Sequence, residues 1–259
     1  MITEETRGHA RILRFDRPEK RNALSKADVL ALGALIRTAS EDPAIRGVVL
    51  AAAPSDAERR VFVAGGDLDE ITSLYELGGE AGADAIIEVG EALDAIDACT
   101  VPVIAAVAGD TLGGGCELVL RCDVVFAEAS ARFSFKHAAM GLAPAWGGAH
   151  RLVLRVGLLR AKELLFTARA VLAEEAFAMG LVTELAANAE TRALSFVDAI
   201  AQHDRDVIAA QKRLLQDLAA TAIDPAVAAS LQRSTLRSLF GVGANERVLV
   251  AHRERRRKS

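Results

Sequence analysis

Residues 105–117 read AAVAGDTLGGGCE, and this stretch carries the clearest information about the fold. The apolar run at 103–107, introduced by Pro102, predicts a buried strand, and a helix is expected from Cys116 to about Arg121. Glycines between the two let a ligand approach the backbone closely. The first N–H groups of a helix are unpaired and carry a favourable dipole. The segment therefore predicts a site for an anion or a developing oxyanion, or else a plain strand-to-helix turn.

Residues 61–68 repeat this arrangement, with the strand Val61-Phe62-Val63 running into paired glycines and then into Asp67, which is expected to cap a short helix. One N–H group from each of two such turns is enough to hold an oxygen that becomes negatively charged. Glu117 lies just inside the helix that follows the other turn. Its carboxylate complements the helix dipole there and is also well placed for acid/base work.

Strands and helices alternate through about residue 128, which favours a layered α/β core. Strands are expected at 10–15, 47–51 and 123–127, and a helix capped by Ser25 is expected through about Ser40. After about residue 147 the pattern is mostly helical, with one last strand at 181–185. A length of 259 residues suits one core with an appended segment. We therefore divide the chain into a core at 1–189 that holds the site and a helical region at 190–259.

The net charge of −4 gives no reason to expect nucleic acid or a membrane as a partner. No apolar run reaches the roughly 18 residues of a membrane span, and the polar N-terminus does not resemble a signal peptide. Cys99, Cys116 and Cys122 have no paired spacing, so a cytoplasmic location is expected. Cys116 and Cys122 lie in an apolar segment and are expected to be buried thiols. The sequence has no metal-ligand spacing. The basic run at 253–258 is either a solvated helix end or a contact for an anionic group such as a nucleotide phosphate.

Residues 133–148 read FSFKHAAMGLAPAWGG and hold the only tryptophan, Trp146, together with His137. A lone histidine is more often structural than catalytic, so both roles stay open for His137. The pair Gly147-Gly148 precedes a helix and is either a turn or a second anion site at a helix end.

Five motifs occur in an order that resembles the crotonase (enoyl-CoA hydratase/isomerase) superfamily, over about residues 10–186. They are RPEKRNAL at 17–24, AGGD at 64–67, AAVAGDTLGGGCELVLRCD at 105–123, MGLAPAWGG at 140–148 and GLVTE at 180–184. The resemblance implies a spiral of ββα units followed by a C-terminal helical trimerisation region. It also implies assembly as a homotrimer or a hexamer.

The resemblance implies an acyl-CoA substrate, with coenzyme A as the acyl carrier and no tightly bound cofactor or metal. It implies that the N–H groups of Gly66 and Gly114 bind the thioester oxygen. The segments expected at coenzyme A contain Lys20, Arg21, Ala23, Leu24, Ala64, Gly65, Asp67, Leu68 and Gly113. The residues expected in the substrate pocket are Met140, Pro144 and Trp146.

The acid/base positions follow the family only in part. Hydratases of the family use two glutamates; Glu117 matches the first, and His137 stands at the second. Histidine can transfer a proton near neutral pH. The loop also resembles ethylmalonyl-CoA decarboxylase-like members, which carry a similar histidine and a PSWGG segment where this chain has PAWGG at 144–148. Their GGPAN-like stretch corresponds to GVGAN at 241–245.

These features predict a lyase of fatty acid metabolism that stabilises a thioester enolate. Hydration of a 2-enoyl-CoA is the first expectation. Decarboxylation of ethylmalonyl- or methylmalonyl-CoA is the main alternative, and double-bond isomerisation is also compatible. A non-catalytic or RNA-binding protein of the same fold is the alternative of another class, and the basic run at 253–258 would be its sign.

Overall fold

The chain folds around two sheets, as shown by a computed structural model that describes residues 1–55, 57–222 and 224–258. The six-stranded sheet has the order β1-β2-β3-β5-β7-β10, and the four-stranded sheet has the order β4-β6-β8-β9. Among the strand pairs of the described residues, only β1–β2 and β8–β9 are antiparallel. The strands of the first sheet are β1 Ile2–Arg7, β2 Ala10–Phe15, β3 Gly47–Ala52, β5 Val103–Val107, β7 Val124–Ala127 and β10 Glu184–Leu185; those of the second are β4 Val61–Val63, β6 Asp110–Leu112, β8 Arg132–Ser134 and β9 Val171–Leu172.

The chain advances as a spiral, because each turn gives one strand to each sheet and then a helix. The first turn is β3, β4 and α2 (Leu68–Leu74), the second is β5, β6 and α5 (Gly114–Arg121), and the third is β7, β8 and α6 (Gly148–Val156). Neighbouring turns pair in parallel within both sheets. The α/β class and the ββα spiral expected from the sequence are therefore confirmed. The strands β6 and β8 were not expected; each has only three residues, too few for a recognisable pattern.

The helix α1 (Lys26–Glu41) begins where the sequence predicts, with Ser25 and Asp28 forming a reciprocal capping box. Its buried face includes Val29, Leu32 and Ile36. Two further helices follow α2 in the chain, α3 (Gly79–Glu91) and α4 (Asp94–Ala98). The remaining helices of the core are α7 (Leu158–Thr167) and α8 (Ala173–Ala178).

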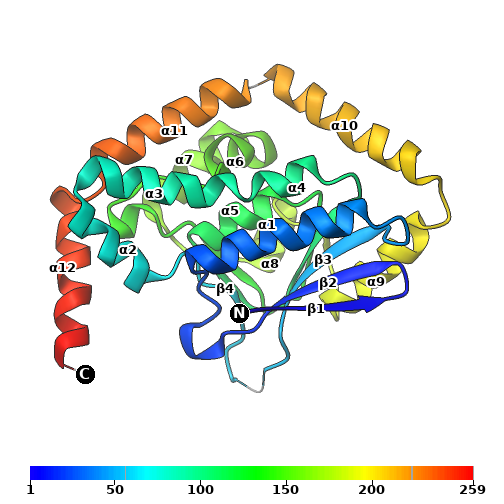
Figure 1. Ribbon diagram of the computed structural model, residues 1–259, viewed down its shortest axis with the longest axis horizontal. Coiled ribbons are helices and arrows are strands. Elements are labelled where there is room, and N and C mark those ends of the chain that lie inside the picture. Colours follow the sequence, from blue (N-terminus) through cyan, green and yellow to red (C-terminus); the bar gives the residue numbers. More distant parts are fainter. Residues whose placement is uncertain (56, 223, 259) are drawn as a thin grey trace.

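Both faces of the six-stranded sheet are covered, which explains why its central strands β3, β5 and β7 are apolar along their whole length. One face packs against the main cluster, which includes Leu13 and Leu50. The opposite face, with Ile12 and Val49, packs against Val197 of α9 (Ala189–Ile200). Most of α9 falls in the 190–259 region that we separated from the core on the basis of the sequence, but in the structure this helix packs on the sheet as part of the layered core. The helices beyond it are α10 (Arg205–Ala222), α11 (Pro225–Leu239) and α12 (Gly243–Lys258), which follow the outside of the molecule (Figure 1).

The last helix, α12, packs against α2, which belongs to the first third of the sequence (Figure 1). His252 Nε2 lies 2.7 Å from Asp69 Oδ1, and Arg256 Nη1 lies 3.0 Å from the same oxygen. Arg253 pairs with Glu76, which belongs to the short helix η2 (Tyr75–Leu77). The basic run at 253–258 is thus joined to acidic side chains of the α2 region through two of its arginines.

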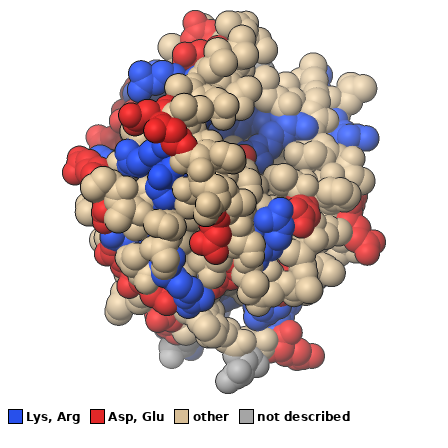
Figure 2. Space-filling view, turned by 90° about the vertical axis from the view of Figure 1, so that its right-hand side faces the viewer, with Lys and Arg blue, Asp and Glu red and all other residues tan. Residues whose placement is uncertain are grey.

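Charged side chains of both signs are interspersed over the face seen in Figure 2, where no large field of one sign is visible. Within residues 1–55, 57–222 and 224–258, no helix combines the length and apolar character needed to cross a membrane. Cys99, Cys116 and Cys122 are buried free thiols, and burial raises the pKa of Cys122 to about 12.

Candidate active site

The two glycine turns predicted from the sequence lie against each other. They follow β4 and β6, which are neighbours in the four-stranded sheet. Gly65 has φ of 102°, and a Cβ atom there would stand 3.0 Å from Leu112 O and 3.2 Å from Gly114 N. The 17–24 segment joins them, because Leu24 N–H donates to Gly65 O at 2.8 Å and Asp67 N–H donates to Leu24 O at 2.8 Å. Three motifs far apart in sequence therefore meet at one point.

Two backbone N–H groups at this point are free to bind a ligand. Among the described residues, neither Gly66 N–H nor Gly114 N–H has a hydrogen-bond acceptor, although both glycines line a cavity. The neighbouring Gly113 N–H is used in the fold and donates to Ser134 O at 2.9 Å. Backbone donors inside a protein are nearly always paired. The two unpaired donors beside one cavity can therefore hold an oxygen that carries negative charge.

The ring of Trp146 explains why glycine is required at position 114. A Cβ atom on Gly114 would stand 2.6 Å from the ring, whereas one on Gly66 would stand at an ordinary 3.5 Å from it and nearer to Ile71 Cδ1, at 3.1 Å. A Cβ atom on Gly90 of α3 would stand 2.8 Å from the same ring. Trp146 is only 6% exposed, so its ring cannot move aside into solvent.

Glu117 projects from the first turn of α5 beneath these donors and is 2% exposed. Its Oε2 accepts hydrogen bonds from Trp146 N–H and Gly148 N–H, both at 2.9 Å. Its Oε1 is 2.9 Å from His137 Nε2 and 3.3 Å from Ala145 N. Burial by itself would raise the pKa of Glu117, but the bond to His137 and the backbone donors outweigh it, so the pKa lies below its ordinary value.

His137 is 8% exposed and belongs to the segment that follows β8. Its Nε2 is the atom that meets Glu117. Its other ring nitrogen, Nδ1, is buried and has no hydrogen-bond partner within the described part of the chain. If Nε2 carries the hydrogen that Glu117 accepts, Nδ1 of the neutral ring has a free lone pair. The pair thus has the form of a base oriented by a carboxylate.

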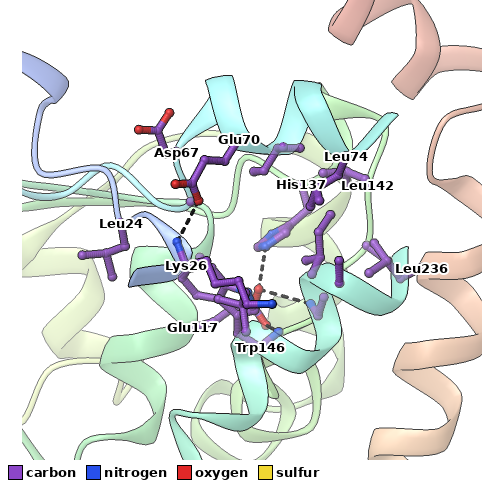
Figure 3. Close-up of a pocket in the computed structure, with 18 of the residues that line it drawn as sticks. Leu24, Lys26, Asp67, Glu70, Leu74, Glu117, His137, Leu142, Trp146 and Leu236 are labelled. Carbon is purple, nitrogen blue, oxygen red and sulfur yellow. Dashed lines mark hydrogen bonds and ion pairs between the residues drawn. The ribbon is translucent and has the colours of Figure 1, made fainter. Parts of the chain in front are cut away.

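The cavity beside this pair has a volume of about 420 Å³. It is lined by Leu24, Lys26, Gly66, Asp67, Glu70, Ile71, Ser73, Leu74, Ala85, Ile86, Val89, Gly114, Glu117, His137, Leu142, Ala143, Ala145, Trp146 and Leu236. Figure 3 shows Lys26, Asp67 and Glu70 to one side of Glu117, and Leu74, Leu142 and Leu236 to the other. Glu117, His137, Gly66, Gly114 and Trp146 thus meet at one cavity, as the sequence analysis expected them to. Met140 and Pro144 do not line it.

A model of the enoyl-CoA hydratase/isomerase family matches residues 5–257, nearly the whole chain. The chain belongs to this family. A crotonyl-CoA hydratase of Syntrophomonas wolfei is 36% identical over 67% of this chain and 64% of its own length. A 2,3-dehydroadipyl-CoA hydratase of Escherichia coli is 32% identical over 87% of this chain and 85% of its own. In four curated relatives, all named as enoyl- or crotonyl-CoA hydratases, the region matched by this chain covers 64–67% of the relative's own length.

A solved enoyl-CoA hydratase/isomerase of Mycobacterium paratuberculosis superposes with a TM-score of 0.84 and 26% identity, over 96% of this chain and 97% of that one. A second, from Xanthobacter autotrophicus Py2, has a TM-score of 0.88 at 24% identity and shows the shared fold, over 98% of this chain and 93% of that one. The family resemblance read from five motifs is therefore confirmed, and the protein is an enzyme of this family.

The segments expected to bind coenzyme A in this enoyl-CoA hydratase/isomerase family member lie at the charged end of the cavity. Leu24, Gly66 and Asp67 line it. Ala23, Gly65 and Leu68 are next to these residues in the chain, and Ala64 precedes Gly65. Lys20 forms an ion pair with Asp69 of α2. Arg21 does not reach this cavity; it lies 3.7 Å from Asp110 and lines a separate hollow. The described residues contain no group of three or more histidine, cysteine or acidic side chains that could hold a metal.

The C-terminal segment of this enoyl-CoA hydratase/isomerase family member supports the site through Asn245, a residue that is fully buried. Its Oδ1 accepts a hydrogen bond from Gly241 N–H at 2.7 Å, and its Nδ2 donates to Met140 O at 2.8 Å. Met140 N–H in turn donates to His137 O at 3.0 Å. Met140 therefore belongs to the support of the histidine and not to the wall of the cavity.

Some residues of the cavity were missed by the sequence analysis. Lys26 and Glu70 line it, and so do the apolar residues Ile86 and Leu236 of α3 and α11. Helices α3 and α11 carry no motif, and their apolar residues follow the periodicity of any amphipathic helix. The only signal was the apolar spacing itself, which does not separate a cavity wall from a core.

Proposed function

We propose that this enzyme adds water to the double bond of a 2-enoyl-CoA. The observation that carries the proposal is the meeting of two unpaired N–H groups, on Gly66 and Gly114, with the buried Glu117–His137 pair. The names of the hydratase relatives support the same reaction.

The two glycines act on the thioester carbonyl. Its oxygen accepts hydrogen bonds from Gly66 N–H and Gly114 N–H, and these bonds strengthen as the oxygen gains charge and the enolate forms. Each such donor contributes about 10²–10³-fold to the rate of comparable reactions. The turn geometry fixes both donors before the substrate arrives, so no reorganisation is needed in the transition state.

The proton is handled by the Glu117–His137 pair. Both oxygens of Glu117 already accept two hydrogen bonds each, which fills the lone-pair positions of a carboxylate. The free lone pair is on Nδ1 of His137. We therefore assign to Nδ1 the proton that water loses as its oxygen bonds to Cβ, while the π electrons move toward the thioester. Because Nδ1 is buried in this structure, the assignment requires it to become accessible from the cavity when the substrate binds. Glu117 stabilises the imidazolium, which then returns the proton to Cα and completes the addition of one water molecule.

Coenzyme A is the proposed carrier, with its nucleotide part toward Lys20 and the 23–24 and 64–68 segments. A homotrimer or hexamer is proposed as the assembly. Large apolar side chains exposed on α7 and α10 support it, among them Leu159, Phe166 and Leu215. Light scattering on the purified protein tests this point, and a monomer at micromolar concentration would contradict it.

Decarboxylation of a short malonyl-type CoA is a second candidate, favoured by His137 at the place of the second carboxylate. Loss of CO₂ gives the same enolate, held by Gly66 and Gly114, and a protonated pair would deliver the proton to Cα. The deciding assay compares crotonyl-CoA with ethylmalonyl- and methylmalonyl-CoA. Turnover of crotonyl-CoA is expected; release of CO₂ without any hydration would replace the first proposal by the second.

A further inference from the structure

The far end of the cavity indicates which acyl group the site takes. We infer that the acyl group is an uncharged aliphatic chain, and that Leu74, Leu142 and Leu236 select it over a chain that ends in a carboxylate. The inference rests on the proposed function in one respect, the direction in which the acyl-CoA lies.

That direction follows from the two ends of the cavity. The segments proposed for coenzyme A meet the cavity at Leu24 and Asp67, on the same side as Lys26 and Glu70 (Figure 3). Glu70 accepts a hydrogen bond from the backbone N–H of Lys26 at 2.7 Å, so this end is polar and held in place. The reacting carbons must lie by Glu117 and His137. The rest of the acyl chain then extends to the other side.

The other side is made by apolar residues. On that side Figure 3 shows Leu74 of α2, Leu236 of α11 and Leu142, while Ile71 of α2 and the α3 residues Ile86 and Val89 add further apolar lining to the cavity. Leu236 of α11 lines the cavity and is fully buried. A methylene group that enters this space leaves water, and each one buried contributes about 0.8 kcal/mol, or about fourfold in affinity.

A terminal carboxylate would meet no partner in this space. Of the described residues that line the cavity, the only lysine or arginine is Lys26, whose Nζ lies 3.7 Å from Glu88 Oε2 and so already has an anionic partner. Arg237 follows Leu236 in the sequence, but it pairs with Asp84 at 2.6 Å and does not line the cavity. An ionised group without a partner is strongly disfavoured in an apolar site. We expect a penalty of at least 100-fold in affinity.

Binding of saturated acyl-CoA thioesters tests the inference without requiring turnover. Calorimetry on the full chain should show hexanoyl-CoA binding about 15-fold tighter than butyryl-CoA, which corresponds to two methylenes at about fourfold each. Adipyl-CoA, with the same number of acyl carbons as hexanoyl-CoA, should bind at least 100-fold more weakly than hexanoyl-CoA. Equal or tighter binding of adipyl-CoA would overturn the inference.

Two variants test whether the apolar end of the cavity is the part that selects the acyl chain. Leu74→Arg places a cation at the apolar end and should raise the adipyl-to-hexanoyl affinity ratio by at least tenfold. Leu77→Arg adds the same charge to an exposed position that does not line the cavity, and it should leave the ratio unchanged. An equal effect of the two variants would contradict the assignment. If Leu74→Arg does not fold, the comparison of thioesters on the unmodified protein still decides.

The outcome is separable from that of the proposed reaction. If the protein binds hexanoyl-CoA more tightly than adipyl-CoA but hydrates no enoyl-CoA, the proposed function is wrong and the inferred acyl selectivity stands. If it hydrates hexenoyl-CoA and 2,3-dehydroadipyl-CoA with similar kcat/KM, the proposed function stands and the inferred acyl selectivity is wrong.

Discussion

Replacing Glu117 by glutamine should stop catalysis while the site keeps its shape. The amide oxygen of the new side chain can accept from Trp146 N–H and Gly148 N–H in place of Oε2, which leaves the amide NH₂ facing His137 Nε2. Nε2 must then accept, so the hydrogen of the neutral ring moves to Nδ1. The histidine is left with no lone pair toward the substrate.

The size of the effect follows from that change of tautomer. Loss of a general base lowers the rate by about 10²–10⁴-fold, or about 3–5 kcal/mol in the barrier. Affinity should change little, because Gly66 and Gly114 are untouched. The amide NH₂ also faces the Ala145 N–H donor, so one hydrogen bond is lost and the free energy of unfolding should fall by about 1–3 kcal/mol.

The assay is the decrease in enoyl thioester absorbance with crotonyl-CoA, with kcat and KM determined separately for Glu117→Gln and His137→Gly. Added imidazole should restore part of the activity of His137→Gly, which leaves a space where the base was, and none of Glu117→Gln. A Glu117→Gln enzyme with normal kcat would refute the reasoning. Rescue of Glu117→Gln by imidazole would instead show that Glu117 itself moves the proton.

Gly114→Ala should lower kcat/KM by about 100-fold or more, measured with crotonyl-CoA, because its Cβ would meet the Trp146 ring at 2.6 Å and displace the N–H donor. Asn245→Ala should cost about 1–3 kcal/mol in urea unfolding, since it leaves Met140 O without its donor, and should lower kcat more than it raises KM. The pKa of Asp69 is lowered to about 2 by Lys20 and His252. The stability that Asp69 contributes is therefore full above its ordinary pKa of 3.8 and is lost as pH falls toward 2. The Tm difference between the natural chain and Asp69→Asn should shrink over that interval; a constant difference would contradict the pairing.

The fold and the centre of the site were predictable where local chemistry decides the structure. The turns at Gly65 and Gly114 could be read because they join a buried strand to a helix start, and Ser25 marked the beginning of α1. Five motifs in order then predicted a spiral whose turns bring distant residues together.

Other features depend on contacts that no local pattern records. The role of Leu236 arises only when α11 crosses α3, and Asn245 acquires its partner Met140 from a segment more than 100 residues away. The strand β6 depends on its neighbours β4 and β8 for its hydrogen bonds. Pro144 stands within a motif, yet its two neighbours line the cavity and it does not. Motif membership shows that a segment is at the site, and packing decides which of its side chains face the substrate.

The contact of the Trp146 ring with Gly114 has a consequence for how this sequence can vary. The three atoms nearest to a Cβ atom on Gly114 all belong to this ring, at 2.6–3.1 Å, whereas a Cβ atom on Gly90 would also meet Ala145 O at 3.1 Å. Tolerance at position 114 is therefore epistatic: an alanine that is harmful beside tryptophan should become acceptable once position 146 carries a smaller side chain. In a mutational library positions 114 and 146 should covary, although they are far apart in the sequence.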